Sequence, residues 1–149
     1  MLKKNTFSLH EQSIDKNRIN FNTMKKIIKT TQAPNPVGPY SQGVLINDTL
    51  YTAGQVGIDP STGKLVNINI IKETNQAMHN LMNILKEAGM DFSNVVKTTI
   101  FLSDLNNFTA MNEVYSTYFT DGFPARETVQ VSRLPVDANV EISMIAVLG

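Results

Sequence analysis

Residues 69–89 read NIIKETNQAMHNLMNILKEAG, and this stretch decides what kind of fold the chain can form. Its apolar side chains recur three and four residues apart, which places them on one face of a helix. They are Met78, Leu81, Met82, Leu85 and Ala88. Asn69 is a suitable N-cap, and Gly89 can end the helix in a left-handed conformation. We therefore predict a helix over residues 69–88 that packs its stripe on another layer.

The segment after this helix predicts a strand, a second helix and two more strands. Residues 95–102 are rich in Val, Thr and Ile, which favours a strand. One face of this strand would carry Val96, Thr98, Ile100 and Leu102. Residues 108–119 predict a helix, and further strands are expected near residues 128–134 and 140–148. The second helix has an aromatic stripe, which indicates core packing rather than a nucleic-acid platform: Phe108, Met111, Tyr115 and Tyr118 or Phe119.

The segment before the first helix predicts a strand, a rigid loop and a hairpin. Residues 24–31 predict the strand, and residues 32–40 hold three prolines and a glycine, which forbid helix and sheet pairing. The apolar runs 43–46 and 50–53 flank Asn47-Asp48 and predict a hairpin. Turn formers dominate two more segments, residues 54–57 and 59–63. This order predicts an α+β fold, a largely antiparallel or mixed sheet with two helices on one face.

The composition limits the class of protein. The chain has 149 residues, 42% of them hydrophobic, which fits one globular domain and excludes a disordered tail. Thirteen basic residues balance thirteen acidic ones, so we expect no membrane attraction and no tight nucleic-acid binding. The absence of cysteine excludes disulfides, thiolate metal sites and a cysteine nucleophile. No apolar run is long enough to predict a membrane-spanning helix.

Residues 1–23 differ in composition from the rest. Asn, Lys and Ser are common, and the apolar core of a secretory signal is missing. We expect a flexible N-terminal arm, or an upstream extension with translation beginning at Met24. A mitochondrial transit peptide is the alternative, although arginine is scarce and two acidic residues are present. We accordingly expect a single domain over residues 24–149 in the cytoplasm, or alternatively in the mitochondrion.

Standard catalytic motifs are missing, but Arg126 stands out. The sequence contains no GxGxxG, no phosphate-binding loop, no GxSxG and no HExxH. Arg126 follows a turn and precedes an apolar strand, where a guanidinium can hold a carboxylate through two parallel hydrogen bonds. A surface ion pair with Glu127 or another acidic residue is the plainer interpretation of the same residue.

Glu141 and Tyr40 are the other two unusual positions. Strand alternation places Glu141 on one face with Ser143 and Ile145, so this face need not be fully solvated. The carboxylate could hold a water as a general base, or it could simply protect an edge strand from aggregation. Tyr40 ends the proline-rich loop, where it could close a pocket or only pack.

Seven segments taken together resemble one known family. They are residues 33–43 (APNPVGPYSQG), 51–55 (YTAGQ), 95–99 (VVKTT), 104–108 (DLNNF), 111–115 (MNEVY), 123–126 (FPAR) and 133–135 (RLP). In this order and spacing they are similar to the reactive-intermediate deaminases of the RidA/YjgF group, also called L-PSP endoribonucleases. The resemblance runs from about residue 30 to residue 149.

The resemblance implies a fold, an assembly and a reaction. It implies a chorismate-mutase-like α+β subunit and a homotrimer with a cleft at each subunit interface. It implies hydrolysis of reactive 2-imino and enamino acids, such as 2-iminobutanoate and 2-iminopropanoate, to a 2-oxo acid and ammonia, with no cofactor and no metal. An imine carbon is already electrophilic, so positioning of water and substrate can replace a strong nucleophile.

The same resemblance assigns roles to individual residues. Arg126 matches the arginine that binds the substrate carboxylate, together with the backbone N–H of Gly54. Glu141 matches the glutamate that orients the attacking water. Tyr40 and Asn112 match residues that line the cleft.

This chain departs from the family at two matched positions. Ala53 stands in place of a serine whose hydroxyl faces the site, and Thr128 replaces a cysteine that acts mainly through its backbone. Losing one hydroxyl hydrogen bond costs about 0.5–1.5 kcal/mol. We therefore expect these changes to affect substrate preference and rate more than the reaction itself.

Two other functions remain open on the sequence. A single-strand endoribonuclease or translation inhibitor needs a basic groove, which the balanced charge does not favour. A non-catalytic module that binds 2-oxo acids, or a chaperone-like module, would tolerate the changes at Ala53 and Thr128. RNA cleavage that survives Arg126→Ala would favour the former, and 2-oxobutanoate binding without turnover the latter.

Overall fold

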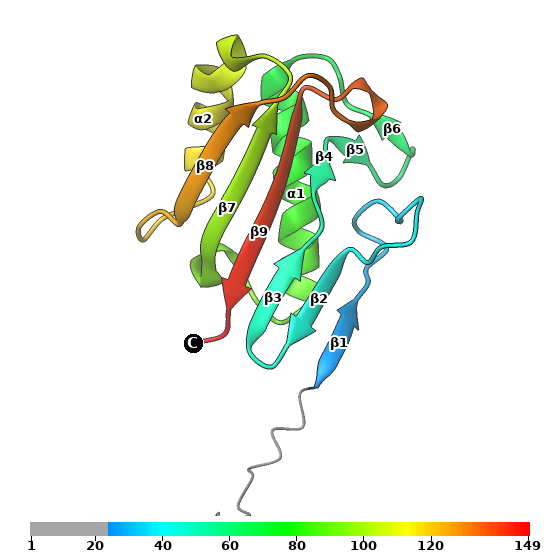
Figure 1. Cartoon of the computed structure of the whole chain (residues 1–149), viewed down its shortest axis with the longest axis vertical. Coiled ribbons are helices and arrows are strands. Elements are labelled where there is room, and N and C mark those ends of the chain that lie inside the picture. Colours follow the sequence, from blue (N-terminus) through cyan, green and yellow to red (C-terminus); the bar gives the residue numbers. More distant parts are fainter. Residues whose placement is uncertain (1–23) are drawn as a thin grey trace, which may run out of the picture.

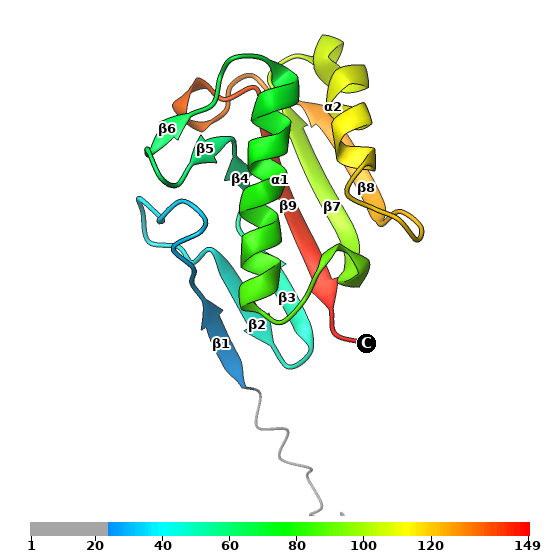
Figure 2. The same cartoon turned by 180° about the vertical axis from the view of Figure 1, so that it is seen from behind.

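Helix α1, Ile70–Glu87, lies across one face of the sheet in the computed structural model, which describes residues 24–149 (Figures 1 and 2). The side chain of its N-cap, Asn69, accepts a 2.9 Å hydrogen bond from the backbone N–H of Lys72. Gly89 follows the helix with φ of +74°, which glycine adopts at little cost. The predicted helix is thus confirmed at both ends. The arm predicted over residues 1–23 lies outside the described residues.

The apolar stripe of α1 forms the centre of the core. Met78, Leu81 and Leu85 are fully buried as predicted, whereas Met82 and Ala88 are only partly buried. The buried face also includes two residues outside the predicted stripe, Ala77 and Ile84. The stripe is wider than predicted because α1 packs against the second helix as well as the sheet.

A mixed sheet forms the second layer, in the order β1-β2-β3-β9-β7-β8, with β4 also paired to β9. Its strands are β1 Lys25–Ile28, β2 Gly43–Ile46, β3 Thr49–Thr52, β4 Gln55–Val56, β7 Val95–Leu102, β8 Ala125–Gln130 and β9 Val140–Val147. Among the described strands, β7 and β8 pair in parallel and the other pairs are antiparallel. A separate small sheet pairs β5, Ile58–Asp59, with β6, Lys64–Leu65.

Helix α2, Phe108–Ser116, lies beside α1 on the same face of the sheet (Figure 2). Three single-turn 3-10 helices complete the described elements: η1 Phe92–Asn94, η2 Leu105–Asn107 and η3 Pro135–Asp137. The predicted α+β class, the mixed sheet and the two helices on one face are confirmed.

Two predicted boundaries are wrong, and hydrogen bonding explains both. Strand β8 spans Ala125–Gln130 rather than residues 128–134, because it pairs with β7, which ends at Leu102. Helix α2 ends at Ser116 rather than residue 119, since the hydroxyl groups of Ser116 and Thr117 donate back to carbonyls of the last turn. The segments predicted as turns at residues 54–57 and 59–63 also contribute short strands, because β9 and β6 supply partners for them.

A bulge in β7 reverses the predicted position of Val96. The pairing of β7 with β9 shifts register between Val95 and Lys97. Val95 is therefore buried and Val96 is 50% exposed, whereas Thr98 and the alternate residues after it keep the predicted inner face. An extra residue in an antiparallel ladder moves the side chains before it to the opposite face.

The buried side chain of Gln42 holds the start of the proline-rich loop. Its carbonyl oxygen accepts a 2.7 Å hydrogen bond from the backbone N–H of Thr30. Its amide nitrogen donates to the carbonyls of Thr30, Ala33 and Pro34 at 2.9–3.1 Å. Prolines lack the N–H groups that form regular ladders, so Gln42 supplies the bonds that fix this loop.

We expect Gln42→Ala to lower the free energy of unfolding by about 2 kcal/mol or more, because it leaves several backbone groups without partners. Asn83→Ala is the matched control. This change removes one exposed hydrogen bond to the same loop, which the side-chain amide nitrogen of Asn83 donates to the carbonyl of Gln32 at 2.8 Å. It should lower the free energy of unfolding by about 1 kcal/mol or less. Urea unfolding measures both, and equal losses would contradict the role given to Gln42.

Candidate active site

The residues predicted for the site lie around two separate hollows. Four of them line a hollow of about 540 Å³, here called the glutamate hollow: Tyr40, Ala53, Gly54 and Glu141. Two of them line a hollow of about 380 Å³, here called the arginine hollow: Asn112 and Arg126. Thr128 is not among the lining residues of either hollow.

Arg126 and Glu141 project from opposite faces of the sheet. Glu141 alternates along β9 with the buried residues Val140 and Ile142, so it points away from the helices. Arg126 is in register with buried Thr98 and lies against α2, on the helix side. One chain therefore does not bring these two side chains together.

The carboxylate of Glu141 lies against the Cα of Gly54. Tyr51 pairs with Ile145 and Gln55 pairs with Ile142, so residues 52–54 face residues 143–144. Three residues of the segment that runs from β3 to β4 thus lie opposite two residues of β9. The extra residue forms a β-bulge, a feature that occurs often beside active sites. A Cβ added at Gly54 would overlap the side chain of Glu141. Glycine at this position is thus what lets the carboxylate approach the bulge.

Glu141 is half-buried in mainly apolar surroundings. Val37, Val56 and Ile58 are among the apolar side chains that line its hollow. Burial raises the pKa of Glu141, because the charged form loses its solvation. Within residues 24–149 no hydrogen bond or ion pair engages its carboxylate. Such a group is better suited than a solvated carboxylate to take and return a proton.

Glu73 of α1 holds the loop that closes one side of the glutamate hollow. This loop contains Val136 and Asp137, whose φ values of +52° and +56° are strained for non-glycine residues. The fully buried carboxylate of Glu73 accepts hydrogen bonds from the backbone and side-chain N–H groups of Asn139, at 2.6 and 2.8 Å. Our sequence reasoning missed Glu73, although its position four residues before Ala77 places it on the buried face of α1.

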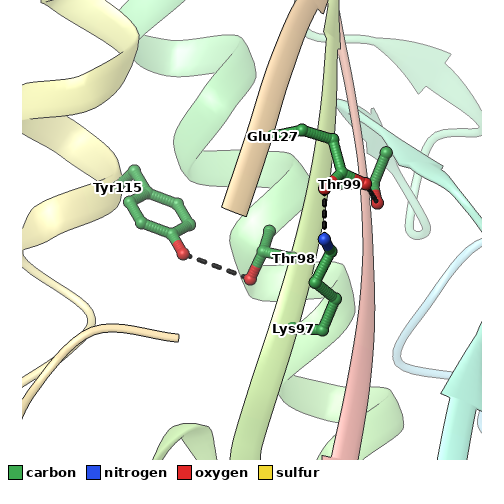
Figure 3. Close-up of polar contacts among 5 residues, drawn as sticks. All are labelled: Lys97, Thr98, Thr99, Tyr115 and Glu127. Atoms are coloured by element: carbon green, nitrogen blue, oxygen red, sulfur yellow. Dashed lines mark hydrogen bonds and ion pairs between the residues drawn. The ribbon is translucent and has the colours of Figure 1, made fainter. Parts of the chain in front are cut away.

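Arg126 does not pair with Glu127, which excludes that ion pair as the explanation of this arginine. Glu127 faces the other side of β8, where it binds Lys97 and accepts a 2.6 Å hydrogen bond from the hydroxyl of Thr99 (Figure 3). The guanidinium lies instead over the ring of Tyr115, with Cζ 4.8 Å from the ring centroid. Among the described residues no carboxylate pairs with Arg126. Its charge is therefore available to an anionic ligand.

The remaining predicted residues divide between the two hollows or lie outside them. Asn112 lines the arginine hollow together with Arg126, and Ala53 lines the glutamate hollow together with Gly54. The hydroxyl of Thr128 is buried and has no hydrogen-bond partner among the described residues. Tyr40 is 51% exposed at the edge of the glutamate hollow, so it does not simply pack in the core.

Metal and membrane signals are also absent from the described part of the chain. No three His, Asp or Glu side chains within residues 24–149 are grouped so that they could hold a metal ion. No helix in this range is both long and apolar enough to cross a membrane. His79 is exposed on α1, where its ring meets that of Tyr118 edge to face.

Comparisons with known proteins agree with the fold. A family model described as endoribonuclease L-PSP matches residues 30–148. The 2-iminobutanoate/2-iminopropanoate deaminase of Mus musculus is 52% identical over 126 residues, which cover 85% of this chain and 93% of the mouse protein.

Solved structures show the same fold. The YjgF gene product of E. coli is 40% identical with a TM-score of 0.80, and E. coli TdcF with bound serine is 38% identical with a TM-score of 0.80. Each match covers 83% of this chain and 99% of the E. coli chain. The protein is thus an α+β protein with the fold of these solved structures. It belongs to the RidA/YjgF family, also called the L-PSP family.

Gly54→Ala should lower the free energy of unfolding by about 0.5–1.5 kcal/mol, because the new methyl group forces the flexible Glu141 side chain out of its present rotamer. Gly38→Ala is a control in the same hollow, since its Cβ would meet only the Tyr40 ring at 3.6 Å. Chemical denaturation should show little change for Gly38→Ala, and Glu141→Ala should restore part of the stability lost in Gly54→Ala. Equal tolerance of both alanines would contradict the close contact.

Glu141→Gln should change how stability depends on pH. Burial raises the pKa of Glu141 above its ordinary value of 4.5, so the folded state holds the proton more tightly than the unfolded state. The favourable contribution of Glu141 to the free energy of unfolding is complete below pH 4.5. It is lost as the pH rises through the pKa of Glu141 in the folded state. The uncharged variant should therefore be more stable than the parent at neutral pH, and urea titrations should show this gap narrowing in acid. A gap independent of pH would contradict the buried position.

Proposed function

We propose that this chain is a 2-iminobutanoate/2-iminopropanoate deaminase, which hydrolyses reactive 2-imino acids to 2-oxo acids and ammonia. The observation that carries the proposal is the pair of opposite charges, Arg126 and Glu141, each without an ionic partner in its own hollow. The mouse protein of that name, 52% identical over most of both chains, supports the same reaction.

Arg126 is the carboxylate anchor in this proposal. Its planar guanidinium can donate two parallel hydrogen bonds to a carboxylate, which fixes both the position and the plane of the substrate. TdcF, a relative solved with bound serine, also binds a molecule that carries a carboxylate. The backbone N–H of Gly54 is the second donor that we assign to this carboxylate, and Tyr40 and Asn112 line the cleft around it.

Glu141 handles the water and the protons. It accepts a proton from the attacking water as the water oxygen bonds to the imine carbon, and the C=N double bond becomes a C–N single bond. This proton passes to nitrogen, which gives a carbinolamine with one hydroxyl and one amino group. Glu141 then takes the hydroxyl proton and passes it to the same nitrogen, so that the C–N bond breaks, the C=O bond forms and ammonia leaves. The raised pKa of Glu141 suits it to both steps, because it can hold the proton between them.

We infer that the site is completed between copies of the chain in a homotrimer of chorismate-mutase-like subunits. Arg126 and Glu141 project from opposite faces of the sheet, so a neighbouring copy is needed to bring one of each together. The face of the sheet away from the helices also exposes apolar side chains that a second copy could cover, such as Tyr51 and Val129. Closed rotational symmetry would then give three equal clefts.

Arg126→Ala should abolish turnover while leaving the oligomer intact, because it removes the substrate anchor. The measurement is a coupled assay in which a threonine dehydratase supplies 2-iminobutanoate and semicarbazide traps what the protein does not hydrolyse. The parent should lower semicarbazone formation and Arg126→Ala should not. Lys86→Ala, an exposed change in the last turn of α1, is the control and should act like the parent.

A mixing experiment tests the shared cleft in the same assay. Arg126→Ala and Glu141→Gln are each expected to be inactive alone. If they are unfolded together and refolded, random trimers should regain about a quarter of the parental activity, since each interface then has that chance of an intact pair. If the refolded mixture regained no activity, the result would indicate that Arg126 and Glu141 act within one chain. RNA cleavage that survives Arg126→Ala and repurification would instead support the ribonuclease function.

A further inference from the structure

Two aromatic rings of α2 form a corner around the guanidinium of Arg126. Its Cζ lies 4.8 Å from the ring centroid of Tyr115 and 5.7 Å from that of Phe108. Phe108 and Tyr115 are seven residues apart, which is two helical turns, so both project from the same side of α2. We call this pair the aromatic corner.

The core holds one ring of the aromatic corner firmly. Tyr115 is 2% exposed, and its hydroxyl donates a 3.1 Å hydrogen bond to the hydroxyl oxygen of Thr98 (Figure 3). Thr98 is the β7 residue in register with Arg126 on β8. The ring of Tyr115 is thus tied to the same point of the sheet from which the arginine projects.

The other ring is not a core residue. Phe108, predicted as part of the apolar stripe, is 37% exposed at the start of α2. The buried members of that stripe are Met111 and Tyr115. Core packing therefore does not account for an aromatic side chain at this position, whereas contact with the guanidinium does.

The aromatic corner can hold a cation without neutralising it. The face of an aromatic ring attracts a guanidinium through its quadrupole and leaves the N–H groups in the guanidinium plane free. A carboxylate partner would occupy those N–H groups, and the nearest candidate in sequence, Glu127, binds Lys97 and Thr99 on the other face of the sheet. Arg126 therefore keeps its charge beside the hollow that it shares with Asn112, and no carboxylate among the described residues occupies its donors.

We propose that Phe108 and Tyr115 are positioning residues, which hold the Arg126 guanidinium in the orientation that receives the substrate carboxylate. This inference rests on the proposed function, in which Arg126 is the anchor. It extends that function to two residues that touch the arginine and that our sequence reasoning assigned only to the core.

The test uses paired substitutions. They separate the effect of the aromatic ring from that of the hydroxyl group, and a change in guanidinium position from a change in protein stability. Phe108→Leu removes the more exposed ring, and Phe108→Tyr restores one. Tyr115→Leu removes the buried ring, and Tyr115→Phe keeps it without the hydroxyl. Val114→Ala is the stability control, because it trims a buried side chain of α2 that is not part of the aromatic corner.

We expect Phe108→Leu to raise the KM for 2-iminobutanoate and the Kd for 2-oxobutanoate by about three- to tenfold, and Tyr115→Leu by about tenfold or more. The kcat should change much less, because an anchor holds substrate and transition state alike. Phe108→Tyr and Tyr115→Phe should stay within about twofold of the parent. Val114→Ala should lower the thermal midpoint without moving KM. Unchanged KM and Kd in both leucine variants would overturn the inference.

A second readout does not depend on activity. The sequence contains three arginines, so the Nε–Hε NMR signal of Arg126 can be assigned by comparison with Arg126→Lys. Ring currents from the aromatic corner should shift this signal away from the chemical shift of a free arginine side chain. Because Phe108 is partly exposed, the Phe108→Leu variant should fold, and its Arg126 signal should move back toward that value. If the parent protein neither binds 2-oxobutanoate nor hydrolyses the imine, the proposed function fails. The Arg126 signal then still tests whether the aromatic corner positions the guanidinium. A changed chemical shift in Phe108→Leu supports this role, and an unchanged chemical shift overturns it.

Discussion

The pairing of β9 with three other strands is the constraint on which the rest of the structure depends. β9 pairs with β7 along its length and with β3 and β4 on its other side. The bulge between β3 and β4 lies opposite β9, where the Thr52 hydroxyl accepts a 2.9 Å hydrogen bond from the backbone N–H of Met144. The same bulge places Gly54 against the side chain of Glu141. One irregularity between β3 and β4 therefore stays hydrogen-bonded to β9 and also shapes the site.

The sheet separates two chemical environments that the proposed reaction needs. Glu141 lies among apolar groups on one face, where desolvation raises its pKa. Arg126 lies against aromatic rings on the other face, where its charge is retained. Direct contact within one chain would pair the two charges and remove the reactivity of both. In the proposed trimer, a cleft assembled between chains would let each side chain keep its own environment until substrate binds.

Much of the fold could be predicted because it follows from local rules. The ends of α1 were confirmed, since a cap and a helix-ending glycine act over a few residues. The placement of Val96 and the start of β8 were wrong, because both depend on the partner strand. Gln42 and Glu73 were missed. Helical spacing places Glu73 on the buried face of α1, but for neither residue does the local sequence show the distant partners that it binds when buried.

The sequence by itself determined the helices, the hairpin, the α+β class and the family, since periodicity, turn residues and ordered motifs are properties of the chain alone. Only the tertiary structure excluded an ion pair between Arg126 and Glu127, because the rings beside Arg126 and the partners of Glu127 come from other elements. It also decided that Phe108 contacts an arginine instead of the core. Burial and charge pairing arise between residues far apart in the sequence, as Glu73 and Asn139 are, and no local pattern records them.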